Sequence, residues 1–483
     1  MNAMSKDKAK AGGLLNRLFQ VKKTGAIVIG KALIAATRLL GRGGTTLPGR
    51  MAIRIKPDLS ELLAGQLLKG ALVVTGTNGK TTTSALIKNI LKAAGYSCIH
   101  NQSGSNMSWG VASALVDSAS VGGTITADWA LMEADEGAFP KIVRDIRPLG
   151  IVVTNIFRDQ LDRFGEIDRI QDAIGHGLQA QPAGGFQVVN ADDPSLVSLD
   201  GLKSKQRLTY GLEIDPIEDS FQNTGRDLKT CPLCKKELTY ERVYFAHLGH
   251  YHCSACVFRR PRPDVRLTGL TINADGSSLL TINTSDKQIN INSPLPGTYN
   301  YYNLLAALTC AVALKIPEAT VVKTLETANP SFGRMESFMV NERELVIALI
   351  KNPVGANEVL RTILNRAEKT TLLVAINDKI ADGTDVSWLW DVDFEQLETR
   401  PEQLTATFAA GLRAWDMAVR FKYAGLDRQQ VVVEENSGTA LRRALQATPP
   451  GGKLYILPTY TAMLEIRRHL NQMGYGRPYW EDH

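Results

Sequence analysis

The chain alternates short apolar runs with longer amphipathic, helix-like stretches. Because buried strands that alternate with helices form parallel sheets, this rhythm predicts an α/β domain over residues 58–334. Antiparallel strands are expected within 267–282, followed by a helix near 302–314. Four apolar runs are typical of buried parallel strands, at residues 71–75, 129–132, 150–154 and 186–190.

A second rhythm of the same kind follows residues 333–341, which we interpret as a linker. It predicts a Rossmann-like α/β domain over 335–483, with helices between its strands. The length of 483 residues is enough for about three structural units at typical domain sizes. The expected strands of this domain are 345–350, 371–376, 417–421, 431–433 and 454–457.

Charge is distributed unevenly and sets apart an N-terminal arm, residues 1–57. The arm carries seven Lys and five Arg against Asp7, a net +11, which leaves −5 for the rest because the whole chain carries +6. Its longest apolar run is interrupted by Lys31 and Arg38, so no spanning helix is expected. The arm is interpreted as a basic helix packed on the body or lying on an anionic membrane surface, or as a solubilising tail.

Four of the six cysteines form two pairs inside a polar insertion at about 221–263. The spacing C-x2-C-x18-C-x2-C, made by Cys231, Cys234, Cys253 and Cys256, is typical of a structural Zn²⁺ ribbon in a reducing cytoplasm. Two disulfides are the alternative. The neighbouring residues His247, His250 and His252 are expected near the site or at the surface, with metal ligation as their alternative role.

The segment TGTNGKTTT follows an expected strand and opens an expected helix. Backbone N–H groups of such a loop bind phosphate oxygens, Lys80 would reach the outer phosphates and Thr81 would ligate Mg²⁺. Val74 departs from the first glycine of the common phosphate-loop pattern. The segment predicts an ATP site made of Thr75, Gly76, Thr77, Asn78, Gly79, Lys80, Thr81 and Thr82.

At this loop the chain resembles the Mur ligases and folylpolyglutamate synthases, which activate a carboxylate as an acyl phosphate for attack by an amine. Further segments match in order: LMEADE, TNIFRDQLDRFG, NADDP, PGTYNYYNLLAA and FGRME. The resemblance implies that Glu133 binds Mg²⁺ and takes part in catalysis. It also implies nucleotide contacts for Asp193, Asn300 and Arg334.

Two positions depart from that family. The metal-side His is replaced by Gln160, and no Lys occurs from residue 144 to residue 202, where many Mur ligases use a carbamylated Lys. The resemblance therefore leaves open which residues replace the family's His and carbamylated Lys near the metal.

An acidic loop is expected after the second strand of the C-terminal domain. It contains Asp378, Asp382, Asp385, Asp391, Asp393 and Glu395, with Trp388 and Trp390 among them. A solvated loop is one interpretation. Aromatic residues beside acids on a strand-end loop also suit a recognition or active-site surface.

The acidic loop, LIKNPVGANEV and the inserted cysteine ribbon together resemble the MurT family, the synthetase subunits of lipid II isoglutaminyl synthase. The resemblance implies ATP-dependent amidation of the α-carboxylate of D-Glu in the lipid II stem peptide. Ammonia would come from a GatD-like glutaminase in a heterodimer. The chain's other thiols, Cys98 and Cys310, are expected in the core because neither lies in a nucleophile turn.

In such a complex an acid of the loop could orient the glutaminase His, completing a triad, or could deprotonate ammonium. Asp378 is the first candidate because it ends a strand, followed by Asp382 and Asp385. A conventional ligase that adds an amino acid to a carboxylate is the alternative function. Nucleic-acid binding is not expected because the body is acidic, and the expected location is cytoplasmic, peripheral at the inner face of the membrane.

Overall fold

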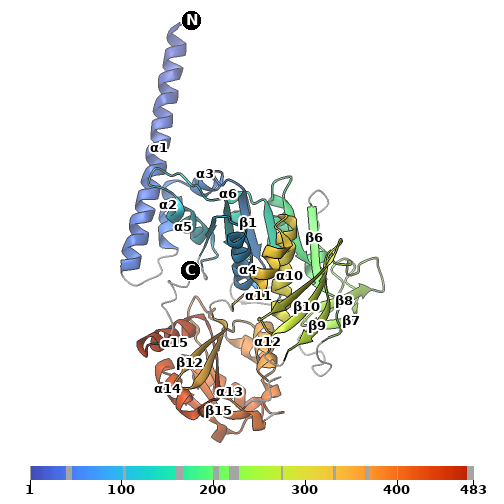
Figure 1. Cartoon of the computed structure of the whole chain (residues 1–483). Coiled ribbons are helices and arrows are strands. Elements are labelled where there is room, and N and C mark those ends of the chain that lie inside the picture. Colours follow the sequence, from blue (N-terminus) through green and yellow to red (C-terminus); the bar gives the residue numbers. More distant parts are fainter. Residues whose placement is uncertain are drawn as a thin grey trace.

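The computed structural model describes residues 2–39, 46–101, 105–157, 167–199, 206–216, 228–273, 276–329, 333–364, 369–399 and 401–475, with side chains from residue 20 onward. Figure 1 shows two α/β bodies, the central domain above the C-terminal domain, and a helix that projects from the central domain. Gln160, Phe332 and the first part of the cysteine insertion lie outside the described residues.

The central domain is built on a nine-stranded sheet in the order β11-β10-β9-β6-β5-β4-β1-β3-β2. The strands from β2 to β6 and β9 run parallel, whereas β10 and β11 add antiparallel pairs. The strands are β1 (Gly70–Thr75), β2 (Cys98–His100), β3 (Trp129–Glu133), β4 (Gly150–Val153), β5 (Phe186–Asn190), β6 (Gln206–Leu212), β9 (Val265–Ile272), β10 (Ser278–Asn283) and β11 (Gln288–Ser293).

Helices cover both faces of the parallel part of this sheet, which explains why β1, β3, β4 and β5 are continuous apolar runs, whereas β10 and β11 alternate buried and more exposed residues. In β1, Leu72 and Val74 join one core, and Ala71 and Val73 join the other. The first face carries α4 (Lys80–Ala93), α10 (Thr298–Ala313) and α11 (Glu318–Glu326). The second is packed by α3 (Leu59–Ala64), α5 (Ser108–Ser118), α6 (Phe139–Ile146) and α8 (Ile167–Ala180), and a short α9 (Pro194–Val197) follows β5.

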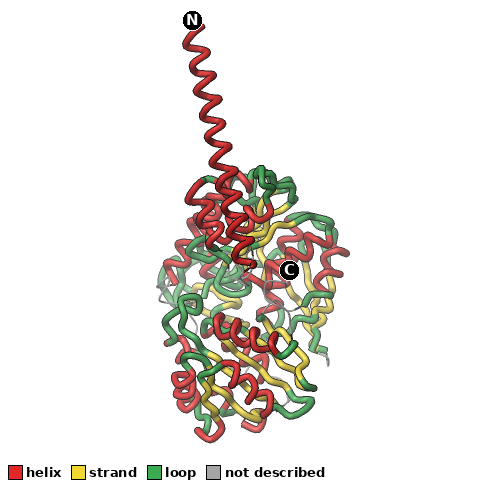
Figure 2. The backbone as a smooth tube through the Cα atoms, turned by 90° about the vertical axis from the view of Figure 1, so that its left-hand side faces the viewer, coloured by secondary structure: helices red, strands yellow, loops and turns green. Residues whose placement is uncertain are grey.

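The N-terminal arm is a long helix, α1 (Asn2–Leu39), followed by α2 (Leu47–Ile55). The second half of α1 packs on the central domain, where Ala26 and Ile27 are fully buried and Gly30 faces Val116. The first half extends beyond the body (Figure 2). No helix in the described ranges is both long and apolar enough to cross a membrane.

The cysteine insertion forms a separate two-stranded antiparallel hairpin beside the central sheet. Its strands are β7 (Leu238–Phe245) and β8 (Leu248–Cys253), paired from Leu238↔Cys253 at the open end to Phe245↔Leu248 at the turn. The four cysteines lie around the open end. The turn lies at the other end and is buried against the central domain, where Phe245 packs on Tyr302 of α10.

The C-terminal domain is a six-stranded sheet in the order β12-β13-β17-β14-β15-β16, parallel except for β12. Helices α12 and α13 pack on one face, and α14 and α15 pack on the other. The elements are β12 (Arg334–Val340), β13 (Arg343–Ala348), α12 (Pro353–Leu364), β14 (Thr370–Ala375), β15 (Leu404–Ala410), α13 (Ala414–Tyr423), β16 (Val431–Glu434), α14 (Ser437–Ala447), β17 (Lys453–Pro458) and α15 (Tyr460–Gln472), with short 3-10 turns at Ser387–Asp391, Phe394–Leu397, Pro401–Gln403 and Arg428–Gln430.

Two sequence-based expectations for this domain are wrong. Residues 417–421 are helical, within α13, because Ala414, Met417 and Phe421 are buried at helical spacing; the strand there is β15, just before. The segment 333–341 is not a free linker but contains β12, which pairs with β13 at the edge of the sheet. An edge strand is half exposed, so its sequence lacks the apolar run that marks the buried strands.

Candidate active site between the two domains

The predicted phosphate loop leaves the carboxyl end of β1 and enters α4. Gly76 and Gly79 have φ angles of 120° and 87°, in the region that favours glycine. A Cβ at Gly76 would lie 2.3 Å from Thr154 Oγ1, and one at Gly79 would lie 2.2 Å from Asn303 Oδ1. Both glycines are therefore required by backbone conformation and by close neighbours.

Residues 154–157, which follow β4, fix the conformation of this loop. Thr77 N–H donates to Asn155 O at 2.9 Å, and Asn78 N–H donates to Asn155 Oδ1 at 2.9 Å. The Phe157 N–H in turn donates to Thr77 Oγ1 at 3.0 Å. The TNIF segment, residues 154–157, thus fixes the backbone of the phosphate loop through these hydrogen bonds.

Lys80 is nearly buried and folds back onto its own loop. Its Nζ donates to Gly76 O and forms an ion pair with Glu136 at 3.3 Å. Glu136 is itself nearly buried, so the positive charge is neutralised within the protein. Phosphate oxygens bound at the loop would be stronger partners for Lys80 than the neutral Gly76 carbonyl.

The two residues predicted to hold Mg²⁺ are in contact. Thr81 Oγ1 donates to Glu133 Oε2 at 3.0 Å. Burial raises the pKa of Glu133, and the positive charges of Lys80, Arg334 and Lys351 oppose that rise. A hydroxyl and a buried carboxylate suit a hard cation, so these residues fit Mg²⁺.

A pocket beside the loop is lined by both domains. The central domain contributes Asn78, Gly79, Thr82, Asn155, Phe245, Tyr299, Tyr302 and Asn303, and the C-terminal side contributes Gly333, Arg334, Met335, Ala348, Leu349, Val354, Gly355, Glu358 and Val359. The domains also touch directly, since Asn352 Nδ2 donates to Asn78 Oδ1 at 3.0 Å. The carboxyl ends of β1 and β13 therefore face each other across the pocket.

Three predicted nucleotide residues have protein partners here. Thr75 Oγ1 donates to Ala134 O, and Asn300 Nδ2 donates to Pro296 O at 2.7 Å. Asp193 is fully buried and accepts from Ile156 N at 2.7 Å and Ser195 N at 2.9 Å. Asn303, one helical turn after Asn300, lies against the loop. The direct nucleotide contacts of Asn300 and Asp193 stay predictions.

Four further residues belong to the site and were not singled out from the sequence. Glu136, Lys351, Asn352 and Asn303 reach it because of chain packing. Glu136 lies in the quoted LMEADE segment and Asn303 in PGTYNYYNLLAA. Lys351 and Asn352 closely follow an expected strand, and a position at the carboxyl end of a strand is the sequence signal that could have identified them.

The four paired cysteines form one cluster. Their Sγ atoms all lie within 4.8 Å of one another, with 3.6 Å between Cys231 and Cys256 and 3.4 Å between Cys234 and Cys253. These distances exceed a disulfide bond and fit the sulfur spacing of about 3.8 Å around tetrahedral Zn²⁺. The cluster contains no His ligand; His250, for example, instead contacts Leu212 O at 2.8 Å.

The acidic loop lies at the carboxyl edge of the C-terminal sheet, and its acids differ in environment. Asp378 Oδ2 accepts from Arg413 Nε at 2.8 Å while its side chain stays partly exposed. Asp382 is buried, which raises its pKa, and it accepts from Thr461 N at 2.6 Å. Asp385 accepts from Ser387 N at 2.8 Å at the start of a 3-10 turn. Asp378 and Asp385 are thus partly exposed, whereas Asp382 is buried, and the catalytic role of any of the three stays a prediction.

Of the two remaining cysteines, Cys310 is buried in the core as expected, whereas Cys98 is only partly buried, on the edge strand β2. Burial raises the pKa of Cys98 to about 11 and that of Cys310 to about 12. The nearby His100 uses Nδ1 in a 2.8 Å contact with Leu131 O. Since a nucleophilic thiol requires a lowered pKa, neither residue is suited to glutamine hydrolysis.

Comparisons with known proteins agree with this architecture. A Mur ligase middle domain matches residues 74–311, and a MurT ligase C-terminal domain matches residues 349–463. In solved structures, the fold is similar to a pseudomurein peptide ligase type C from Methanothermus fervidus, with a TM-score of 0.63, 21% identity and coverage of 85% of this chain and 80% of that one. MurF from Acinetobacter baumannii gives 0.62 at 17% identity, covering 88% and 80%.

Two curated relatives cover nearly the whole chain. The lipid II isoglutaminyl synthase (glutamine-hydrolyzing) subunit MurT of Staphylococcus aureus is 33% identical over 93% of this chain and 98% of its own length. The subunit of the same name from Streptococcus pneumoniae is 34% identical, over 93% and 97%. With its Mur ligase core, cysteine cluster and matching C-terminal domain, the chain is an ATP-dependent ligase that belongs to the MurT family.

Proposed function

We propose that this chain amidates the α-carboxylate of D-Glu in the lipid II stem peptide, giving D-isoglutamine. The observation that supports this most directly is the full-length similarity to MurT subunits, combined with a phosphate site at a cleft between the domains. The carboxylate oxygen attacks the γ-phosphorus of ATP and ADP leaves. Ammonia then attacks the acyl carbon, the bond between this carbon and the bridging oxygen breaks, and phosphate leaves with that oxygen and with one proton from the nitrogen.

The residues of the phosphate loop serve the first step through position and charge. The N–H groups after Gly76 and the side chain of Lys80 neutralise the transferring phosphoryl group. Thr81 and Glu133 hold Mg²⁺, which offsets phosphate charge when bound. Arg334 and Lys351 enter from the C-terminal side, so domain contact completes the cationic environment.

We propose that ammonia is supplied by a GatD-like glutaminase that docks over the acidic loop. Support comes from the shielded thiols of this chain and from apolar side chains exposed beside the loop. Ile380 is 89% exposed, Leu412 59% and Trp415 63%, close in sequence to Asp378 and its partner Arg413. Apolar surface of this kind around a polar centre suits a protein partner.

An amidation assay tests the function. The chain would be mixed with lipid II, Mg²⁺ and ATP, and given ammonium, or glutamine with the glutaminase. We expect a product one dalton lighter than the substrate, because OH is replaced by NH₂. A mass gain with an added amino acid, and none of the lighter product with ammonia, would instead indicate a conventional amino-acid ligase.

We propose that the cysteine cluster holds a structural Zn²⁺. The sulfur separations and the lack of an open position support this assignment. Metal analysis of the purified chain should give equimolar zinc, lost on Cys256→Ser. A zinc-free chain whose four thiols all react with a thiol reagent in the folded state would contradict it.

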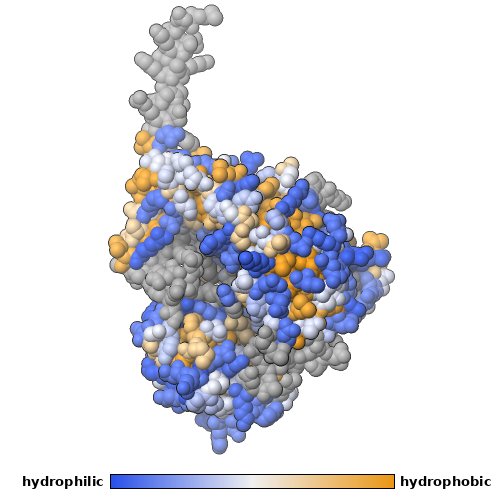
Figure 3. Space-filling model, in the orientation of Figure 1, coloured by the Kyte–Doolittle hydropathy of each residue, from blue (hydrophilic) through white to orange (hydrophobic). Residues whose placement is uncertain are grey.

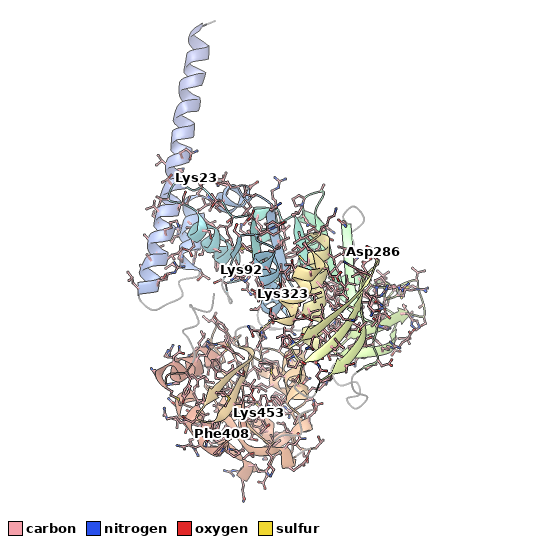
Figure 4. All side chains as sticks on the ribbon, viewed as in Figure 1. Lys23, Lys92, Asp286, Lys323, Phe408 and Lys453 are labelled. Atoms are coloured by element: carbon pink, nitrogen blue, oxygen red, sulfur yellow. The ribbon has the colours of Figure 1, made fainter. Side chains whose placement is uncertain are left out.

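We also propose that the first half of α1 attaches the protein to the inner membrane surface. Lys6, Lys8 and Lys10 belong to the half of α1 that extends beyond the body. Val21 is 69% exposed, and Lys23 lies where the helix meets the central domain (Figure 4), whose surface there mixes hydrophilic and hydrophobic residues (Figure 3). Lys6, Lys8 and Lys10 replaced by Glu should weaken binding to anionic vesicles and leave the packed half intact. Equal binding of wild type and variant would overturn this proposal.

A further inference from the structure

The β7–β8 hairpin joins the cysteine cluster to the nucleotide pocket. At its open end, Cys253 pairs with Leu238 beside the cluster; at its closed end, Ala246 turns the chain with a φ of 48°. An eight-residue strand spans roughly 25 Å, so one module contacts two distant sites. The turn residues Phe245 and His247 are buried in the central domain.

Phe245 forms part of the pocket wall. It lines the same pocket as Asn78 and Gly79 of the phosphate loop. Its ring centroid lies 5.6 Å from that of Phe157 and 5.5 Å from that of Tyr302. A smaller side chain at this position would leave space between the phosphate-loop segment and α10.

His247 supports the segment that holds the phosphate loop. Its Nε2 lies 3.3 Å from Asp193 Oδ1, without the alignment of a hydrogen bond, and its ring packs 5.0 Å from Phe157. Asp193 accepts from Ile156 N, and Phe157 N–H donates to Thr77 Oγ1. A continuous set of contacts therefore runs from the hairpin turn to the loop.

Strand β8 of the hairpin is hydrogen-bonded to residues 191 and 192, which follow β5 and directly precede Asp193. Gly249 N–H donates to Asp192 O at 3.0 Å, and Tyr251 OH donates to Ala191 O at 3.2 Å. Asp192 also accepts from Tyr302 OH at 2.7 Å, on the helix that borders the pocket. Displacement of the hairpin would thus disturb two sides of the pocket.

We propose that the cysteine module, formed by the four cysteines and the β7–β8 hairpin, is a positioning element for nucleotide binding. A metal held by the cysteines would order the hairpin at its open end, and Phe245 and His247 at the turn hold the phosphate loop in its binding conformation. The inference rests on the proposed nucleotide site. Phe245 acts as part of the pocket wall, whereas His247 lies behind Phe157 and acts through its neighbours. Coupling between two binding sites is reciprocal. If bound zinc raises the affinity for nucleotide, bound nucleotide raises the affinity for zinc by the same factor.

The first test measures the Kd of a non-hydrolysable ATP analogue with Mg²⁺ on the full chain. Phe245→Leu and His247→Ala should each weaken binding by about tenfold. Zinc content should stay unchanged, and in ammonia-supported amidation the KM for ATP should rise while kcat is largely retained. Failure of the wild-type chain to bind the analogue would contradict the proposed function itself.

Two controls separate positioning from general destabilisation. Phe408→Leu makes the same change at a buried Phe in β15 of the other domain (Figure 4), and Thr239→Ala alters an exposed residue of the hairpin. Both should keep the wild-type Kd. Wild-type affinity in folded Phe245→Leu and His247→Ala, or an equal loss in Phe408→Leu, would overturn the proposal.

A second measurement needs no variant. The Kd of the wild-type chain for zinc is measured by equilibrium competition with a chromogenic chelator, with and without the Mg²⁺-bound analogue. We expect saturating nucleotide to lower the Kd for zinc by about fivefold or more, and by the same factor by which zinc lowers the Kd for the analogue. An unchanged Kd for zinc would overturn the coupling even if the Phe245 variant did not fold.

Discussion

The two domains place their functional loops at equivalent positions but surround them differently. The phosphate loop leaves the carboxyl end of β1 and is enclosed by residues 154–157, α10 and the hairpin turn. The acidic loop leaves the carboxyl end of β14 and stays open, with Ile380 in solvent and Asp378 partly exposed. The difference supports the proposal that phosphate chemistry is completed within this chain, whereas a partner protein would complete the acidic loop.

The largest effect should come from the enclosed loop. Lys80→Ala removes the cation that neutralises phosphate, so we expect amidation with either nitrogen source to fall by about 10³-fold. Lys92→Ala, on the exposed side of the same helix, is the matched control and should keep wild-type activity. Product mass measures both, and substantial amidation by Lys80→Ala would show that the loop is not the phosphoryl site.

A substitution in the acidic loop should lower amidation only when the nitrogen comes from glutamine. Asp378→Asn keeps the side-chain shape but loses the charge that would orient a partner His. We expect glutamine-dependent amidation to fall by about 10²-fold or more, with ammonium-supported amidation retained. Asp385→Asn, whose contacts are within its own turn, is the comparison variant.

Equal losses with glutamine and ammonium would favour the other role of Asp378, deprotonation of ammonium beside the acyl phosphate. No loss with either source would remove Asp378 from catalysis. The same assay therefore distinguishes an open loop that serves the partner from one that serves this chain's own reaction.

A smaller effect is expected where the two regions meet. Asn352→Ala removes the side chain that bonds Asn78 and also accepts from Gly355 N at 2.8 Å. Loss of one or two such bonds should raise the KM for ATP by about fivefold to tenfold. Asn357→Ala, elsewhere on α12, provides a comparison, and an unchanged KM in Asn352→Ala would contradict a role of the domain contact in ATP binding.

The smallest effect concerns stability and pH. Burial raises the pKa of Glu133 above its usual 4.5, so the native chain binds this proton more tightly than the unfolded chain. The free energy of unfolding therefore loses this contribution as the pH rises above about 4.5. At pH 7 without Mg²⁺, Glu133→Gln should therefore have a higher free energy of unfolding than the wild type.

Denaturant titrations between pH 4 and pH 7 measure that difference. It should shrink toward acidic pH, and Mg²⁺ with nucleotide should stabilise the wild type more than the variant. A difference independent of pH would contradict the role of Glu133 ionisation. The prediction sharpens the comparison because Glu133 is buried beside the phosphate loop, whereas Asp378 on the acidic loop is partly exposed.

The sequence by itself determined the α/β class of both domains, the phosphate loop, the cysteine pairs and the acidic loop. These features depend on local spacing: apolar runs, glycines at a turn, and cysteines two residues apart. Local spacing was insufficient for β12 and β15, which have partly exposed or small side chains, and for α13, whose periodicity was mistaken for a strand.

Tertiary structure decided which residues meet. Lys351 and Asn352 reach the phosphate loop across the domain boundary. Asp382 differs from Asp378 because it is buried and accepts a hydrogen bond from Thr461 N. The turn of the cysteine hairpin lies beside Phe157, nearly ninety residues away in sequence. Contacts of this kind depend on how elements pack around shared cores, and no spacing rule along the chain encodes them.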